Sequence, residues 1–282
     1  MLTWNDYKGS LNLNAYPHDD SPLSLEEKSA ICNRMLTYLL TERGEISAFN
    51  VSYEQKRNII RGYLNERGAN YIEPSILSDW DRLLWSETKE RGIVDVNSLS
   101  YQQSIALWQG DITRLNADAI VNAANNALLG CFIPNHKCID NVIHSAGGPQ
   151  IRSDCAKIIA LQGTREKTGQ VKVTNAYNLP SRYVFHTVGP MSGFTVTEEQ
   201  RAELKSCYLS CLDQAEEMGL STIAFCCVST GIFGFPNEEA AEIATGTVLN
   251  WLLRHKSKLK VVFDTFLDKD YAIYENIFKF IG

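Results

Sequence analysis

The sequence predicts an α/β sandwich with a mixed sheet, preceded by a segment that is helical throughout. From residue 104 onward, short continuous apolar runs alternate with stretches of helical length, as in buried strands that are joined by helices. Before about residue 100, apolar residues recur only at helical spacing. We therefore expect two parts: a helical N-terminal extension, residues 1–100, which packs on an α/β domain, residues 101–282.

The composition is that of an ordinary globular protein, with 44% hydrophobic and 21% charged residues. The net charge of −6 argues against a nucleic-acid partner, although backbone N–H groups can still hold phosphates locally. We find no apolar run of about 20 residues that would span a membrane, and no basic start followed by an apolar run that would mark a secretory signal. The eight cysteines are therefore expected to be reduced thiols in a cytoplasm, some of them in the core and some as metal ligands.

Three helices are expected in the N-terminal extension. The first begins at a capping box formed by Ser24 and Glu27, and it ends at Gly44. Two more are expected at residues 52–66 and 75–90, each followed closely by a glycine. None of the three carries side chains typical of catalysis, so their apolar positions are expected to form a core.

The elements of the α/β domain follow from the same patterns. We expect, in chain order, strands at 104–112 and 117–125, a helix that opens at 138–147, strands at 170–179 and 183–189, a helix at 198–218, a strand at 222–230, a glycine-rich turn and helix within 231–255, a strand at 259–266 and a helix at 268–281. Ligands of such folds sit beyond the carboxyl ends of the strands. The segments that follow strands are therefore the ones to search for a site.

Three of these segments suit the parts of an adenine nucleotide. The first, GDIT at residues 110–113, offers a carboxylate that can accept from an exocyclic amine such as adenine N6, although an Asp there can also simply cap a helix. The second, VNAANN at 121–126, offers amides that can fix a ribose hydroxyl, although Asn is also common in turns. The third, STGIFGFP at 229–236, lets backbone N–H groups and a helix N-terminus face a diphosphate, although a glycine turn can merely join strand to helix.

Taken together, these segments resemble the macrodomain family over roughly residues 104–282. The resemblance also includes IHSAGG at 143–148, VFHTVGP at 184–190 and FLDKDYAIY at 266–274, in the family's order and spacing. It implies a three-layer α/β/α sandwich that binds ADP-ribose. The implied contacts are Asp111, Ile112 and Phe266 at the adenine, Asn125, Cys138, Ile139 and Asp140 toward the distal ribose, and Ser229, Thr230, Gly231, Ile232, Phe233 and Gly234 at the diphosphate.

One loop departs from the family pattern. Where the hydrolytic branch has a short glycine run, this sequence has CFIPNHKC at residues 131–138. The side chains of Cys131, His136 and Cys138 suit Zn²⁺, and three ligands with one open position are typical of a catalytic zinc. Cys155, inside the following helix, is a conceivable fourth ligand. This spacing is not one of the well-known zinc motifs, so on spacing alone two half-buried cysteines beside a surface histidine are the simpler explanation. Zinc is favoured by the position of the loop, where the resemblance places the distal ribose.

The loop resembles that of the zinc-dependent branch of microbial macrodomains, which also carries an N-terminal helical extension. This resemblance implies one zinc per chain. It also implies a hydrolase that removes mono-ADP-ribose from a protein side chain by breaking the bond at C1″ of the ADP-ribose. The implied substrate is a lipoyl-carrier protein modified by a sirtuin-type transferase. Asn125 would orient the ribose, and Asp140 would position water or act as a base. The zinc could lower the pKa of a water or polarise a substrate oxygen. Two other functions stay open, namely an O-acetyl-ADP-ribose deacetylase and a non-catalytic ADP-ribose-binding module. His144 and His186 are expected to be core histidines.

Overall fold

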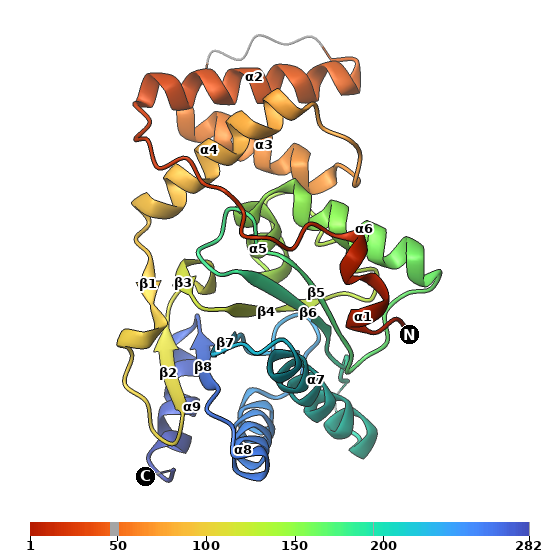
Figure 1. Cartoon of the computed structure of the whole chain (residues 1–282), viewed down its shortest axis with the longest axis vertical. Helices are drawn as coiled ribbons and strands as arrows, with labels where there is room; N and C mark the ends of the chain where they lie inside the picture. The colour runs from red at the N-terminus through yellow and green to blue at the C-terminus, as the bar shows by residue number, and fades with distance from the viewer. Residues whose placement is uncertain (46–50, 194, 282) are drawn as a thin grey trace.

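The computed structural model describes residues 1–45, 51–193 and 195–281, and Figure 1 shows its helices and strands. Helices α2, α3 and α4 form the N-terminal part. Capping residues mark where these helices begin and end. The side chain of Ser24 accepts from the N–H of Glu27 at the start of α2, and Gly44, with a φ of 68°, ends that helix. The bounds are Leu25–Arg43 for α2, Tyr53–Glu66 for α3 and Pro74–Glu90 for α4. The three helices expected from the sequence are therefore present.

The three helices have a core of their own. Their apolar faces bury a single cluster whose members include Ile31, Met35, Leu39, Ile60, Trp80 and Leu83. Burial of such side chains stabilises the fold by about 1.5–3 kcal/mol each. The N-terminal residues also include a short helix that the sequence patterns did not predict, α1 (Trp4–Tyr7). Its Tyr7 is buried against the α/β domain and accepts a hydrogen bond from the backbone of Val173, at 2.7 Å.

The α/β domain is built on a mixed sheet of six strands in the order β2-β8-β7-β4-β6-β5. Neighbouring strands run parallel except β5, which is antiparallel to β6. The strands are β2 (Ile105–Gln109), β4 (Ala119–Ala124), β5 (Val171–Asn175), β6 (Tyr183–Val188), β7 (Thr222–Phe225) and β8 (Lys260–Thr265). A separate short pair joins β1 (Val94–Asp95) to β3 (Leu115–Asn116). The predicted mixed sheet is confirmed.

Helices cover both faces of this sheet, which gives the three layers implied by the resemblance. Helices α5 and α6 lie on the side that faces the N-terminal helices, and α7, α8 and α9 lie on the other side (Figure 1). The bounds are Ile139–Gly147 for α5, Pro149–Gln162 for α6, Glu198–Glu217 for α7, Asn237–His255 for α8 and Asp268–Phe278 for α9. Within the described ranges, none of the helices combines the length and the apolar character needed to cross a membrane.

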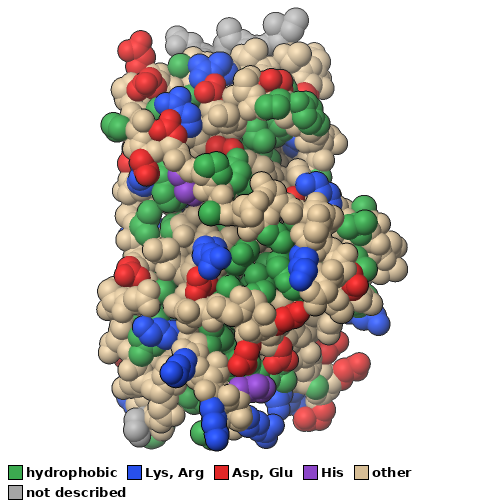
Figure 2. All heavy atoms as spheres, in the orientation of Figure 1, with side chains coloured by type: hydrophobic (Ala, Val, Ile, Leu, Met, Phe, Trp, Pro, Cys, Tyr) green, Lys and Arg blue, Asp and Glu red, His purple; other side chains and the backbone are tan. Residues whose placement is uncertain are grey.

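Three predicted strands are shorter in the structure. The strand expected at 104–112 ends at Gln109, and Ile112 belongs to a 3₁₀ turn. The strand expected at 222–230 ends at Phe225, because the chain then turns into a loop in which Ser229 adopts a left-handed φ of 67°. The strand expected at 170–179 ends at Asn175, where the chain turns back toward β6. Charged side chains of both signs are interspersed over the face seen in Figure 2, in keeping with the mild net charge.

Candidate functional site

The segments predicted to bind a nucleotide lie at one edge of the sheet. Asp111 follows β2, Phe266 follows its neighbour β8, and Asn125 follows β4. The loop at residues 229–234 follows β7, which lies between β8 and β4. Because these four strands are parallel, their carboxyl ends and the segments that follow them meet at the same edge.

The expected adenine contacts lie at one end of this edge. Asp111 caps the short 3₁₀ helix η3 (Ile112–Arg114), accepting from the N–H of Thr113 at 3.0 Å and from its hydroxyl at 2.6 Å. The second oxygen of Asp111 lies 3.3 Å from a guanidinium nitrogen of Arg91, at the end of α4. Asp111 is thus a capping residue, as the simpler interpretation held, and its side chain is 28% exposed. Phe266 is 73% exposed, so its ring is free to lie against a base.

The loop at residues 229–234 has the form expected of a phosphate-binding turn. The N–H of Gly234 donates to Gly231 O and that of Phe235 donates to Ser229 O, each at 3.0 Å. Among the described residues, the N–H groups of residues 230–233 find no acceptor, so they are available to a ligand. Helix α8 begins just beyond the loop and adds the positive end of its dipole.

The left-handed residues of this loop are Ser229 and Gly234. Gly231 has no positive φ, and a Cβ added there would meet no atom within 4 Å. The loop therefore depends on the left-handed conformation at its two ends rather than at Gly231.

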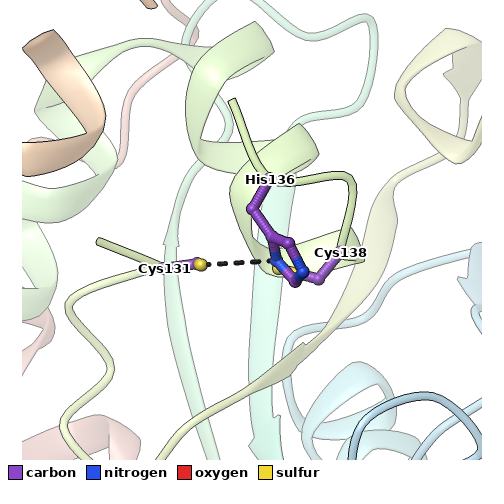
Figure 3. Close-up of side chains that lie close together, drawn as sticks. All are labelled: Cys131, His136 and Cys138. Carbon is purple, nitrogen blue, oxygen red and sulfur yellow. Dashed lines mark hydrogen bonds between the residues drawn. The ribbon is translucent and has the colours of Figure 1, made fainter. Parts of the chain in front are cut away.

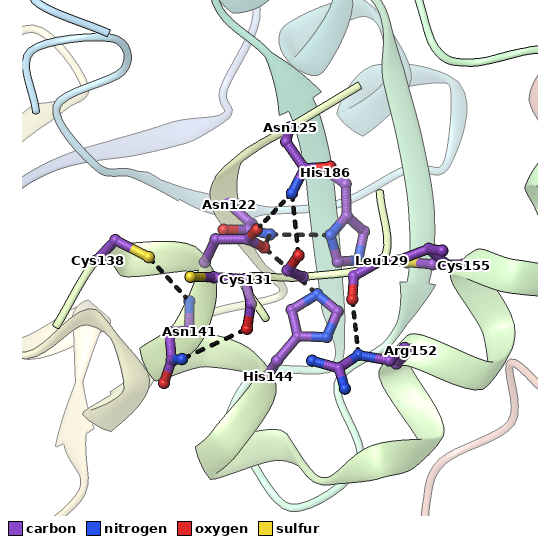
Figure 4. A network of polar contacts seen from close by, with 12 residues as sticks. Asn122, Asn125, Leu129, Cys131, Cys138, Asn141, His144, Arg152, Cys155 and His186 are labelled. Carbon is purple, nitrogen blue, oxygen red and sulfur yellow. Dashed lines mark hydrogen bonds and ion pairs between the residues drawn. The ribbon is translucent and has the colours of Figure 1, made fainter. Parts of the chain in front are cut away.

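The two candidate catalytic residues, Asn125 and Asp140, are in contact within a largely buried polar network. Figure 4 shows this network and labels Asn125, Asn122 and His144. The amide of Asn125 donates to Asp140 at 3.3 Å and to the carbonyl of Gly130 at 3.0 Å. Asn122, on β4, donates to the other oxygen of Asp140 at 2.8 Å. Burial raises the pKa of Asp140 to about 6, while the two amides act in the opposite direction. The sequence patterns placed Asn122 in a binding motif but gave it no role of its own.

His144 and His186 belong to this network, and both are buried, as expected of core histidines. His144 Nε2 lies 3.4 Å from Asp140 Oδ1. His186 is 3.1 Å from the Asn122 amide and 3.0 Å from the Thr174 hydroxyl. Burial lowers the pKa of His186 to about 3 and holds the pKa of His144 well below its usual range, so both rings are neutral at physiological pH. Cys155, considered as a fourth ligand for the loop, has its sulfur 3.7 Å from His186 and belongs to this inner cluster.

The three predicted metal ligands converge in the loop before α5 (Figure 3). The sulfurs of Cys131 and Cys138 and a ring nitrogen of His136 all lie within 4.8 Å of one another. Two ligands of one tetrahedral zinc are separated by about 3.5 Å, given bonds of about 2.0–2.3 Å. The 3.6 Å between Cys131 Sγ and His136 Nδ1 matches that separation. Two thiols and an imidazole at this spacing fit a zinc ion.

Local sequence explains how the loop brings the three side chains together. Gly130 enters it with a φ of 77° and passes so close to the His144 ring that an added Cβ would lie 3.0 Å from it. A tight turn then carries Pro134 and Asn135 at its centre, with Asn135 left-handed and the N–H of His136 donating to Ile133 O at 3.2 Å. Cys138 ends the loop as the N-cap of α5.

Helix α3 braces the outer side of this loop. Arg61 donates to the carbonyl of His136 at 3.0 Å and to the Asn141 side chain at 2.8 Å. Asn65 accepts from the N–H of Asn135 at 3.0 Å and donates to Ser145 at 3.1 Å. We did not predict these contacts, although Arg61 and Asn65 are four positions apart on α3 and therefore lie on the same face of that helix. The N-terminal extension therefore helps to shape the loop of residues 131–138.

Comparison with known proteins finds one matching family and several similar proteins. The Macro domain family matches residues 121–244. A protein-ADP-ribose hydrolase of Staphylococcus aureus (strain MRSA252) is 46% identical over 230 residues, which cover 80% of this chain and 86% of that protein. A protein-ADP-ribose hydrolase of Treponema medium is 39% identical and covers 86% of this chain and 96% of its own length. A Trypanosoma brucei macrodomain solved in complex with ADP-ribose has a TM-score of 0.61 and 30% identity, covering 77% of this chain and 94% of that one.

Proposed function

This chain belongs to the Macro domain family, and it is similar to two protein-ADP-ribose hydrolases over most of its length. We therefore propose that it removes mono-ADP-ribose from modified protein side chains. The observation that carries the proposal is the meeting of Asn125, Asp140 and the loop of residues 131–138 at the edge where the nucleotide-binding segments lie. Release of labelled ADP-ribose from a modified protein tests it. A binding module would release none, and an O-acetyl-ADP-ribose deacetylase would act on that small molecule alone.

The roles of this chain's own residues follow from their positions. Asp111 and Phe266 would hold the adenine, and the N–H groups of residues 230–233 would hold the diphosphate. Asn125 would orient the distal ribose. Asp140, held between two amides, would position water or take its proton as the bond at C1″ breaks. The buried setting of Asp140 keeps competing water away from that proton transfer.

We also propose that Cys131, His136 and Cys138 hold one zinc ion. When bound, zinc supplies Lewis acidity beside the distal ribose. Both cysteines must stay reduced to bind it, which suits the cytoplasm. Burial raises the pKa of the free Cys138 thiol to about 11, so a cation is needed to hold Cys138 as a thiolate at neutral pH. The resemblance to the zinc-dependent branch extends the proposal to a lipoyl-carrier protein, modified by a sirtuin-type transferase, as the substrate.

The proposed adenine contact predicts the effect of Asp111→Ala. This change should weaken ADP-ribose binding by about 1–3 kcal/mol, because an acceptor for a ligand donor is lost. Arg91→Met is the matched control, since it removes the 3.3 Å ion pair but keeps the carboxylate. Calorimetry should show the loss in the first variant and near-normal affinity in the second. Equal losses of affinity in both variants would mean that binding depends on the ion pair between Arg91 and Asp111 and not on a contact between Asp111 and the ligand.

The phosphate loop predicts that Ile232→Pro abolishes binding with little effect on the fold. Proline removes one N–H donor aimed at the diphosphate, and the Ile232 side chain is 71% exposed, so little packing is lost. Ile232→Ala keeps the donor and should bind ADP-ribose normally. If the proline variant shows native circular dichroism and normal affinity, the loop does not bind the diphosphate through that group.

A further inference from the structure

A small cavity lies where the N-terminal helices meet the α/β domain. Its volume is about 40 Å³, and its wall includes Arg57, Arg61 and Trp80 from α3 and α4 and His144 and Arg152 from α5 and α6. A cavity needs roughly 10–15 Å³ to hold one water molecule, so this one holds a few waters or one small ion. The nucleotide-binding segments at the sheet edge are not part of its wall.

Two buried donors in the wall of this cavity lack a partner. Among the described residues, Arg61 Nε and Trp80 Nε1 are buried without a hydrogen-bond acceptor. Trp80 is 1% exposed. Buried N–H groups are rarely left without an acceptor, because each costs about 1–3 kcal/mol. Their gathering around one cavity indicates an occupant that accepts hydrogen bonds.

The charge around the cavity indicates that this occupant is negative. Arg57 is neutralised by Glu87, with nitrogen–oxygen distances of 2.6 and 2.7 Å. Arg61 and Arg152 form no ion pair within the part of the chain that the structure describes. Their guanidinium groups donate only to carbonyl or amide oxygens, such as Asn141 Oδ1 for Arg61 and the carbonyl of Leu129 for Arg152.

The positive charge of Arg152 is held away from water, since this residue is only 5% exposed. Buried charges are strongly disfavoured unless a counter-charge is near. An anion would supply that counter-charge, whereas water would only accept the hydrogen bonds.

We propose that this cavity binds a single chloride-sized anion, held by Arg61 and Trp80 and facing Arg152. Because Arg61 also donates to the carbonyl of His136, the anion would link the N-terminal helices to the loop of residues 131–138. The proposal rests on the cavity and its donors, and it does not depend on the hydrolase activity or on a metal.

Crystals of the full chain grown in sodium bromide test the site directly, because bromide replaces chloride and scatters anomalously. We expect one anomalous peak in the cavity beside Arg61 and Trp80. A cavity that contains only water, or a bromide peak confined to the loop of residues 131–138, would overturn the proposal.

Thermal unfolding gives a second test in solution. At fixed ionic strength, replacing sodium gluconate with sodium chloride should raise the melting temperature by at least about 2 °C and then saturate. Trp80→Phe removes one donor but keeps a ring beside Arg57, and it should lose this response. Arg34→Met, an exposed change elsewhere in the helical part, should keep it. Equal melting temperatures in the two salts, or a full response in Trp80→Phe, would show that no anion binds there.

Discussion

Replacing Cys131 with alanine should remove zinc from the purified protein and reduce hydrolysis at least about 100-fold, yet preserve much of the affinity for ADP-ribose. The two remaining ligands, His136 and Cys138, cannot hold zinc tightly. Affinity should survive because the adenine and the diphosphate are held by Asp111, Phe266 and the loop at 229–234, which follow other strands of the sheet. Metal analysis, calorimetry and the release assay, applied to one preparation, measure the three quantities.

His136→Ala should reproduce this pattern, and Cys227→Ala is the matched control. Cys227 is also half-buried and free, but it lies outside the loop of residues 131–138 and should keep both zinc and turnover. If the metal is structural, loss of Cys131 should instead lower the melting temperature and weaken ADP-ribose binding together, because structural zinc contributes directly to folding. That result would reject the catalytic assignment but keep the metal site.

Replacing Asp140 with alanine should slow hydrolysis by about 10²–10⁴-fold without removing zinc, because general acid–base groups contribute on that scale. Asn122 keeps its contact with His186, and Asn125 keeps its bond to Gly130, so the network should hold its shape. Single-turnover release of ADP-ribose measures the effect.

The control for Asp140 is another buried carboxylate nearby. Asp154 lies on α6 and bonds the Tyr177 hydroxyl, outside the candidate site, so Asp154→Asn should keep full turnover. If Asp140→Ala retains normal turnover while binding zinc and ADP-ribose, Asp140 has no part in the reaction.

The fold was largely predictable because each element is specified locally. Capping at Ser24 and Ser52 marks where α2 and α3 begin, and continuous apolar runs mark the buried parallel strands. The end of β7 could not be predicted from the apolar pattern. Cys226 and Val228 are buried and apolar, so the pattern continues past Phe225 although the hydrogen-bonded strand does not.

The site was predictable only where its residues are close in the sequence. Cys131, His136 and Cys138 lie within eight positions, so their convergence follows from one short loop. The contacts from Arg61 and Asn65 join residues 70 or more positions apart, and they arise from how α3 packs on the α/β domain. Such contacts depend on tertiary structure, which periodicity and motifs do not encode.

Zinc-dependent removal of ADP-ribose from proteins is tested most directly by the release of labelled ADP-ribose from a mono-ADP-ribosylated protein. Release is measured before and after treatment with excess chelator, and again after one equivalent of zinc is restored. We expect rapid release, its loss on chelation and its recovery with zinc. Full activity from zinc-free protein in excess chelator would contradict the metal's role, and no release under any of these conditions would contradict the hydrolase itself.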